Sequence, residues 1–156
     1  MCVYNDNVNE NEWSFACHFT RGGNSDADYS THLQHEQEVA IRARSARTKL
    51  AILIVQDSGV SAPNAMWRRK IAAVTNAPEF KGVCCAIVTN NTLIRGVLTA
   101  LNWMRMRDYQ EALFESTSVA IPWLEMSCGR SLPALRYAAE AWRTDSARKP
   151  TLNASW

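Results

Sequence analysis

The chain has 156 residues, of which 47% are hydrophobic and 21% charged, and its formal net charge is +2. A chain of this length builds one domain with a substantial core, and its hydrophobic content excludes disorder as the main state. No apolar run approaches the roughly 20 residues that span a bilayer, so membrane insertion is not expected. A net charge so close to zero does not favour a dedicated nucleic-acid binder. Residues 1–6 have neither a basic segment nor an apolar stretch, so we expect no signal peptide and a cytoplasmic protein.

The first third of the chain alternates predicted strands with a predicted helix. Residues 1–12 are polar and rich in asparagine, and we expect a flexible N-terminal segment there. Residues 13–20 alternate large apolar side chains with small or polar ones, which is typical of a strand. Apolar residues recur every three or four positions over 28–47, which predicts a helix. The run over 50–55 is continuous, apolar and rich in β-branched residues, as central strands covered on both faces are.

The rest of the chain continues this alternation and then ends in helices. The predicted elements are, in order, a helix over 64–76, a strand over 82–88, a helix over 92–104, a strand over 111–114, a short helix over 116–124 and a last helix over 130–146. Pro122 should shorten or kink the short helix, because it cannot donate a backbone hydrogen bond. A flexible tail is expected over 147–156.

Apolar strands that alternate with helices indicate an α/β fold. We predict a four-stranded, largely parallel sheet with helices covering it and an extra C-terminal helix, all in a single domain over residues 13–146. Crossover connections between the parallel strands should be right-handed.

The cysteines and histidines do not indicate a metal or disulfide framework. The number of cysteines is five, which is odd, and Cys84 and Cys85 are adjacent in a predicted strand, where neighbours face opposite ways. We therefore expect reduced, buried thiols. His32 and His35 can share a helix face, but Glu36 is the only obvious further ligand nearby, so neither a metal nor a cofactor is expected.

Enzyme motifs are absent as well. The chain has no phosphate-binding loop, no dinucleotide fingerprint, no nucleophile elbow and no paired-histidine zinc motif. Ser58 has no histidine in a loop expected nearby, because all three histidines precede residue 36. No motif supports a cysteine hydrolase built from Cys128 and His32 or His35 either. The sequence therefore predicts a protein that is not an enzyme.

The stretch over residues 50–125 carries a resemblance to a known family. It has a buried strand, an acidic loop at Asp57, a Trp-Arg-Arg helix at 67–69, the run AIVTNNTLIRGVLTALNW over 86–103, LFES over 113–116 and Trp-Leu at 123–124. This pattern resembles the STAS-like superfamily, the fold of anti-sigma-factor antagonists and their bacterial relatives. The resemblance covers about half the chain. It implies a bacterial regulatory or signalling domain that is non-enzymatic and acts through protein–protein interaction.

The resemblance also implies site residues at the loop after the strand. Antagonists of the superfamily carry Asp-Ser-Ser-Gly there, and the serine before the glycine can be phosphorylated. This chain has Asp57-Ser58-Gly59-Val60, so Ser58 is the phosphorylation candidate, although one serine of the pattern is missing. Asp57, Gly59 and Arg95 are expected to contact a partner or an anion. The alternatives are that the loop is an ordinary turn and that Arg95 forms a structural ion pair with Asp57.

Two other functions remain open. The first, which the resemblance implies because other superfamily members bind nucleotides or apolar molecules, is a small-ligand domain with a pocket between the helices and the sheet, which methionine, tryptophan and cysteine side chains could line. The second is a homo-oligomeric structural module, for which Trp142 and Trp156 near the C-terminus would supply an apolar patch. A protein partner is expected in the leading interpretation.

Overall fold

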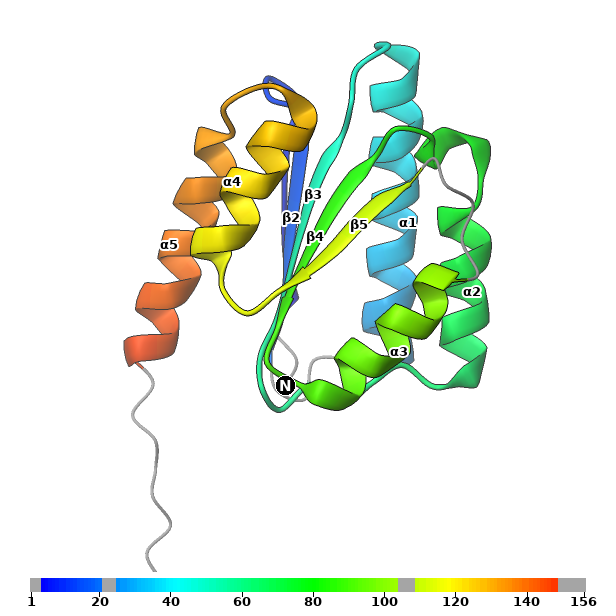
Figure 1. The fold of residues 1–156 in the computed structure, drawn as a ribbon, viewed down its shortest axis with the longest axis vertical. Helices are drawn as coiled ribbons and strands as arrows, with labels where there is room; N and C mark the ends of the chain where they lie inside the picture. The colour runs from blue at the N-terminus through cyan, green and yellow to red at the C-terminus, as the bar shows by residue number, and fades with distance from the viewer. Residues whose placement is uncertain (1–3, 21–24, 104–108, 149–156) are drawn as a thin grey trace, which may run out of the picture.

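A five-stranded sheet runs through the middle of the computed structural model, which describes residues 4–20, 25–103 and 109–148 (Figure 1). The strands lie side by side in chain order as β1 (Tyr4–Asn9), β2 (Ser14–Phe19), β3 (Ala51–Gln56), β4 (Cys84–Thr89) and β5 (Gln110–Phe114). The pairs β2–β3, β3–β4 and β4–β5 are parallel. The predicted α/β fold with four parallel strands is thereby confirmed.

Helices cover both faces of this sheet. One layer consists of α1 (Asp26–Ser45), α2 (Ala65–Thr75), the short 3-10 helix η1 (Pro78–Phe80) and α3 (Thr92–Trp103), and the other of α4 (Thr117–Cys128) and the predicted C-terminal helix α5 (Pro133–Arg148) (Figure 1). Within the part of the chain that the structure describes, no helix is both long and apolar enough to cross a membrane.

The N-terminal segment differs from expectation. Residues 1–12 were expected to be flexible, but Tyr4–Asn9 form β1, which pairs antiparallel with β2 from Tyr4 opposite Phe19 to Asn9 opposite Ser14. The physical reason is that β2 would otherwise leave a row of backbone N–H and C=O groups unpaired at the sheet edge. Residues 149–156 of the expected tail lie outside the described residues.

Helix α4 also differs from expectation. The predicted helix ended at 124 and was to be shortened or kinked by Pro122, but α4 runs from Thr117 through Pro122 to Cys128. Pro122 has no N–H to donate to the Ser118 carbonyl one turn earlier. Both residues are exposed, so water can bind this carbonyl instead. The helix ends at Gly129, which adopts a left-handed backbone with φ of 70°.

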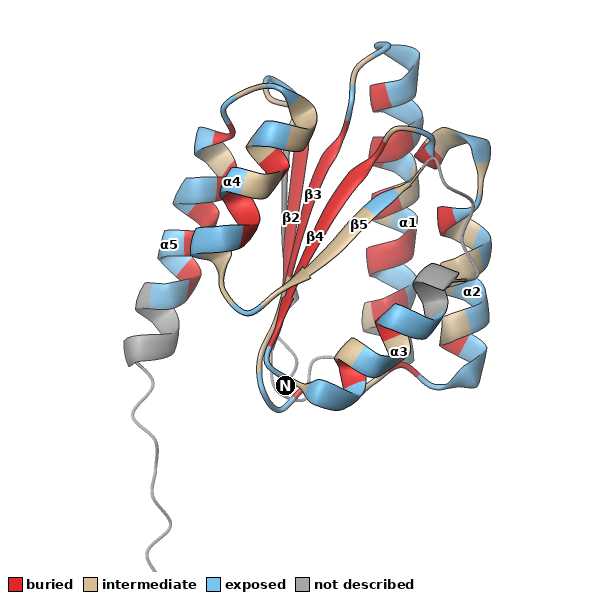
Figure 2. Ribbon diagram, viewed as in Figure 1, coloured by how far each residue is buried: buried red, intermediate tan, exposed pale blue. Residues whose placement is uncertain are grey.

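Strands β2, β3 and β4 are mostly buried, and β5 is half-buried (Figure 2). Burial on both faces explains the nearly unbroken apolar sequences of β3 and β4. Alternate residues of β3 face opposite layers, so that Ile52 packs towards α1 and Leu53 towards α4 and α5. Burying a side chain of this size contributes about 1.5–3 kcal/mol. Cys84 and Cys85 divide in the same way between the two layers, as predicted.

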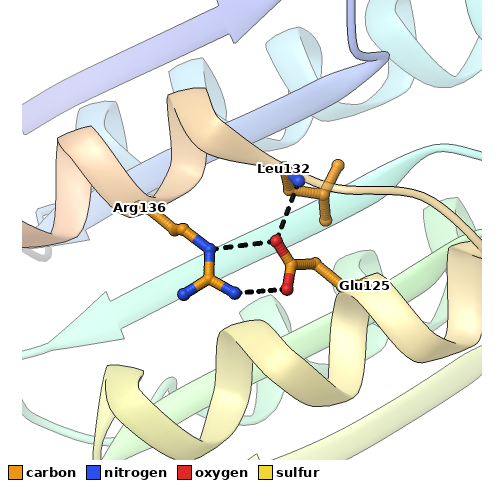
Figure 3. A network of polar contacts seen from close by, with 3 residues as sticks. All are labelled: Glu125, Leu132 and Arg136. Carbon is orange, nitrogen blue, oxygen red and sulfur yellow. Dashed lines mark hydrogen bonds and ion pairs between the residues drawn. The ribbon is translucent and has the colours of Figure 1, made fainter.

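A network of polar contacts around the Glu125 carboxylate joins α4 to α5 (Figure 3). Oε1 of Glu125 on α4 accepts hydrogen bonds from the Leu132 backbone N–H at 3.0 Å and from Arg136 Nε at 3.0 Å. Its second oxygen forms an ion pair with the same guanidinium.

Trp142 of α5 is buried, with 6% exposure, and packs on the sheet. It therefore does not form the expected apolar surface patch, and Trp156 lies outside the described residues.

Candidate functional site

The loop that follows β3 is anchored at both ends and exposed at its tip. The Asp57 N–H donates to the Phe19 carbonyl at 3.0 Å, and the Val60 N–H donates to the Asp57 carbonyl at 3.0 Å, which closes a turn. The Asn91 side chain holds the far end, because its Nδ2 donates to the Val60 carbonyl at 3.1 Å. Val60 is buried, whereas Ser58 and Gly59 are exposed. The hydroxyl of Ser58 is thus accessible from solvent.

The charged residues around this loop form two separate pairs. Asp57 Oδ1 lies 2.7 Å from His18 Nε2, whereas Arg95 Nη1 lies 3.0 Å from Glu115 Oε1. Arg95 and Asp57 therefore do not form the expected ion pair with each other. Asp57 contacts His18 of β2, and Arg95 contacts Glu115 at the end of β5. The Arg95–Glu115 pair is exposed, so it is worth little in free energy.

His18 lies beside the loop, although no histidine was expected near Ser58. Strand β2 pairs with β3 in parallel register, and this brings His18 to the loop. His18 is 7% exposed, and its imidazole packs against the Trp142 ring with centroids 5.1 Å apart. The alternation of strand 13–20 placed His18 opposite the Phe15 face, but only the strand order reveals which loop it meets.

A cavity of about 50 Å³ lies under the first helical layer, between the sheet and α1, α2 and α3. Its walls are largely apolar and include Phe19, Ile54, Ile71, Ile87, Ile94 and Leu98. Its polar lining comes from Tyr29, His32, Glu36, Gln56, Thr75, Tyr109 and Glu111. A cavity of this volume has room for a few water-sized groups.

Two ionisable groups of this lining are deeply buried on α1. His32 is 5% exposed and Glu36 only 2%, and His32 Nε2 lies 3.5 Å from Glu36 Oε2. Burying such groups is costly unless they are paired, so their position on the cavity wall marks it as a candidate site. In the sequence, the only signal was a histidine and a glutamate four positions apart on a helix.

Cys17 extends this pair into a row of three groups. Its Sγ lies 3.5 Å from His32 Nδ1, so a cysteine, a histidine and a carboxylate follow one another. The order is that of a cysteine hydrolase, but Cys17 is 0% exposed within the core against the sheet. A thiol that no substrate can reach has a structural role in this conformation.

The sheet side of the cavity supplies further acceptors. Gln56, at the end of β3, has its Oε1 buried, and no donor for this atom is found among the described residues. Glu111 on β5 places a carboxylate in the same lining. Acceptor oxygens from α1, β3 and β5 therefore converge on an apolar chamber. Among the described residues, no three histidine, cysteine or acidic side chains lie close enough together to hold a metal ion.

The fold defines an α/β protein with one sheet covered on both faces. The chain matches no protein-family model, no curated protein and no solved structure at a significant level. Its function must therefore be inferred from the two sites, the exposed loop after β3 and the cavity beneath α1–α3.

Proposed function

We propose that the chain is a non-enzymatic domain that binds a small organic ligand in the cavity between the sheet and α1–α3. The observation that carries the proposal is the convergence of Glu36, Glu111 and the buried Oε1 of Gln56 on a chamber with largely apolar walls. Apolar walls with a few converging polar groups are typical of small-molecule sites.

The chemistry of the lining favours a ligand that donates hydrogen bonds. Two carboxylates and an amide oxygen face the chamber, and the aromatic rings of Phe19, Tyr29 and Tyr109 contribute to its walls. Carboxylates attract a cation and aromatic faces stabilise one. A primary amine with an apolar body fits this lining better than a carboxylic acid of the same length does.

The cavity volume limits how such a ligand enters. About 50 Å³ accommodates an ammonium head group but not a long body. Helix α3 packs on the core through Ile94 and Leu98, whereas Leu93 is 66% exposed. Because Ile94 and Leu98 also line the chamber, a longer ligand would have to displace α3 outward.

The test compares alkylamines with carboxylic acids of equal length. Thermal unfolding and titration calorimetry are measured with propylamine to hexylamine and with the matching acids. We expect the amines to raise the unfolding temperature and to bind, because a ligand selective for the folded state stabilises it. Glu111→Gln should abolish this effect, and the control Glu115→Gln, on an exposed carboxylate, should retain it. Equal effects of amines and acids, or equal loss in both variants, would refute the proposal.

A second function, that of a regulatory domain with a protein partner, is favoured by the exposed Ser58. We propose that the Asp57–Val60 loop is its contact surface and Ser58 its phosphorylation site, as the resemblance to the STAS-like superfamily implies. A phosphate adds about −1.5 to −2 charges, and it would stand beside the Asp57 carboxylate at an accessible tip. This negative charge would repel an acidic partner surface and attract a basic one.

Two measurements test this second function. Peptide mass spectrometry of the protein from its native cells should find phosphate on Ser58. Quantitative co-purification with Ser58→Glu and Ser58→Ala should then give different partner sets, while Ser61→Ala, also exposed, should match the unaltered chain. An unmodified Ser58 together with identical partner sets would exclude the loop as a switch.

A further inference from the structure

Two thiols lie near the amino-terminal end of β4, at the opposite end of the parallel strands from the Asp57–Val60 loop. Cys84 is the first residue of β4 and Cys128 the last residue of α4, and Cys128 packs against the buried cluster that contains Cys84. Cys84 is 1% exposed and also lies 3.5 Å from Gln110 Oε1, whereas Cys128 is only half-buried. Cys128 is thus the more exposed residue of the pair, and Cys84 is buried in the cluster against which Cys128 packs.

Cationic groups surround the accessible thiol. Lys49 Nζ donates to the Ser127 carbonyl at 3.0 Å, which places its ammonium at the end of α4. The Arg130 guanidinium is fixed by hydrogen bonds to the carbonyls of Glu12 at 2.9 Å and Trp13 at 3.2 Å. These cations oppose the negative end of the α4 dipole, which by itself would disfavour a thiolate on Cys128.

The two thiols have different acidities. The hydrogen bond from Cys84 together with Arg130 and Lys49 lowers the pKa of Cys128 to about 7, even though burial works against it. The hydrogen bond with Cys128 and burial raise the pKa of Cys84. These opposite shifts favour the thiolate on Cys128 and the protonated thiol on Cys84.

We propose that Cys128 and Cys84 form an oxidisable dithiol site, in which the Cys128 thiolate is oxidised by hydrogen peroxide and Cys84 resolves the product into a disulfide. The other described cysteines, Cys17 and Cys85, are 0% exposed and pack in the layer of α1–α3, on the opposite face of the sheet. Because of this difference in exposure and surroundings, we expect hydrogen peroxide to oxidise Cys84 and Cys128 and to leave Cys17 and Cys85 reduced.

The chemistry balances in two steps. The Cys128 thiolate attacks one peroxide oxygen, the O–O bond breaks, and the released hydroxide takes a proton from solvent to form water. The Cys84 sulfur then attacks the sulfenic sulfur of Cys128, the S–O bond breaks, and the leaving hydroxide takes the Cys84 proton as a second water. Two electrons pass from the sulfurs to the peroxide, and one disulfide results.

The experiment treats the full chain with hydrogen peroxide and maps its thiols by peptide mass spectrometry. We expect the loss of two thiols per chain, a Cys84–Cys128 linkage, and full recovery with dithiothreitol. The rate of thiol loss should rise with pH around a midpoint of about 7. A linkage between other cysteines, or oxidation only after unfolding by urea, would overturn the proposal.

Variants separate the two roles. Cys128→Ser should slow thiol loss by on the order of tenfold or more, because the reactive thiolate is gone. Cys84→Ser should instead accumulate a sulfenic acid on Cys128 that dimedone traps. Lys49→Gln should slow the reaction, and Lys81→Gln, which removes an exposed lysine elsewhere, should not. If Cys84→Ser does not fold, Cys128→Ser decides alone, since an unchanged oxidation rate in that variant contradicts the proposal.

Discussion

At the scale of single residues, His18 and Asp57 show how one contact organises the loop after β3. His18 is almost fully buried beside Trp142, and the Asp57 carboxylate accepts or shares its Nε2 proton at 2.7 Å. The carboxylate is 36% exposed on its side chain, so solvent weakens the interaction. The contact nevertheless fixes the position of Asp57, the residue before Ser58.

Asp57→Ala should lower the free energy of unfolding by about 1 kcal/mol, because it leaves a buried imidazole nitrogen without its acceptor. Urea unfolding at pH 7 measures this difference. The control Glu115→Ala removes an exposed partner and should change the free energy by no more than about 0.5 kcal/mol. Equal losses in the two variants would show that the His18–Asp57 pair contributes no more than an exposed ion pair does.

At the scale of elements, α5 is held in place by two carboxylates from distant parts of the chain. Glu12, just after β1, accepts the Ala134 N–H at 3.0 Å, and Glu125 accepts the Leu132 N–H at 3.0 Å (Figure 3). The first backbone N–H groups of a helix have no partner within it, and carboxylates there also oppose the positive end of the dipole. The hydrogen bonds from Arg136 and Leu132 lower the pKa of Glu125.

This lowered pKa gives a pH dependence of definite sign. A carboxyl group whose pKa is lower in the folded state stabilises the fold above its unfolded pKa, and the contribution disappears as pH falls through the folded value. Glu125→Gln should therefore cost about 1 kcal/mol at pH 7. The gap between the variant and the unaltered chain should close between roughly pH 5 and pH 3. A gap that is independent of pH would contradict the assignment.

At the scale of the whole molecule, the sheet joins two cores that share its strands. Leu124 of α4 is 0% exposed in one core, and Phe80 of η1 is 1% exposed in the other. Strands β2, β3 and β4 contribute side chains to both cores. Loss of packing in one core therefore destabilises the strands on which the other core also depends.

Leu124→Ala should therefore lower the free energy of unfolding by about 2–5 kcal/mol while unfolding remains a single transition. Tryptophan fluorescence and far-ultraviolet circular dichroism should give coincident urea curves for this variant. Leu93→Ala, on the exposed face of α3, should stay within about 0.5 kcal/mol of the unaltered chain. Two separate transitions for Leu124→Ala would show that the cores unfold independently.

The sequence by itself determined the local elements, because hydrophobic periodicity is a property of neighbouring residues. The apolar run at Leu50–Val55 predicted a strand buried on both faces, and alternation predicted that Cys84 and Cys85 diverge. Partners distant in the chain were decided only by the tertiary structure. Strand order and register bring His18 to Asp57, 39 positions away, and the packing of α4 on β4 brings Cys128 to Cys84. The cavity under α1–α3 likewise depends on how three helices pack on one sheet, which no local pattern encodes.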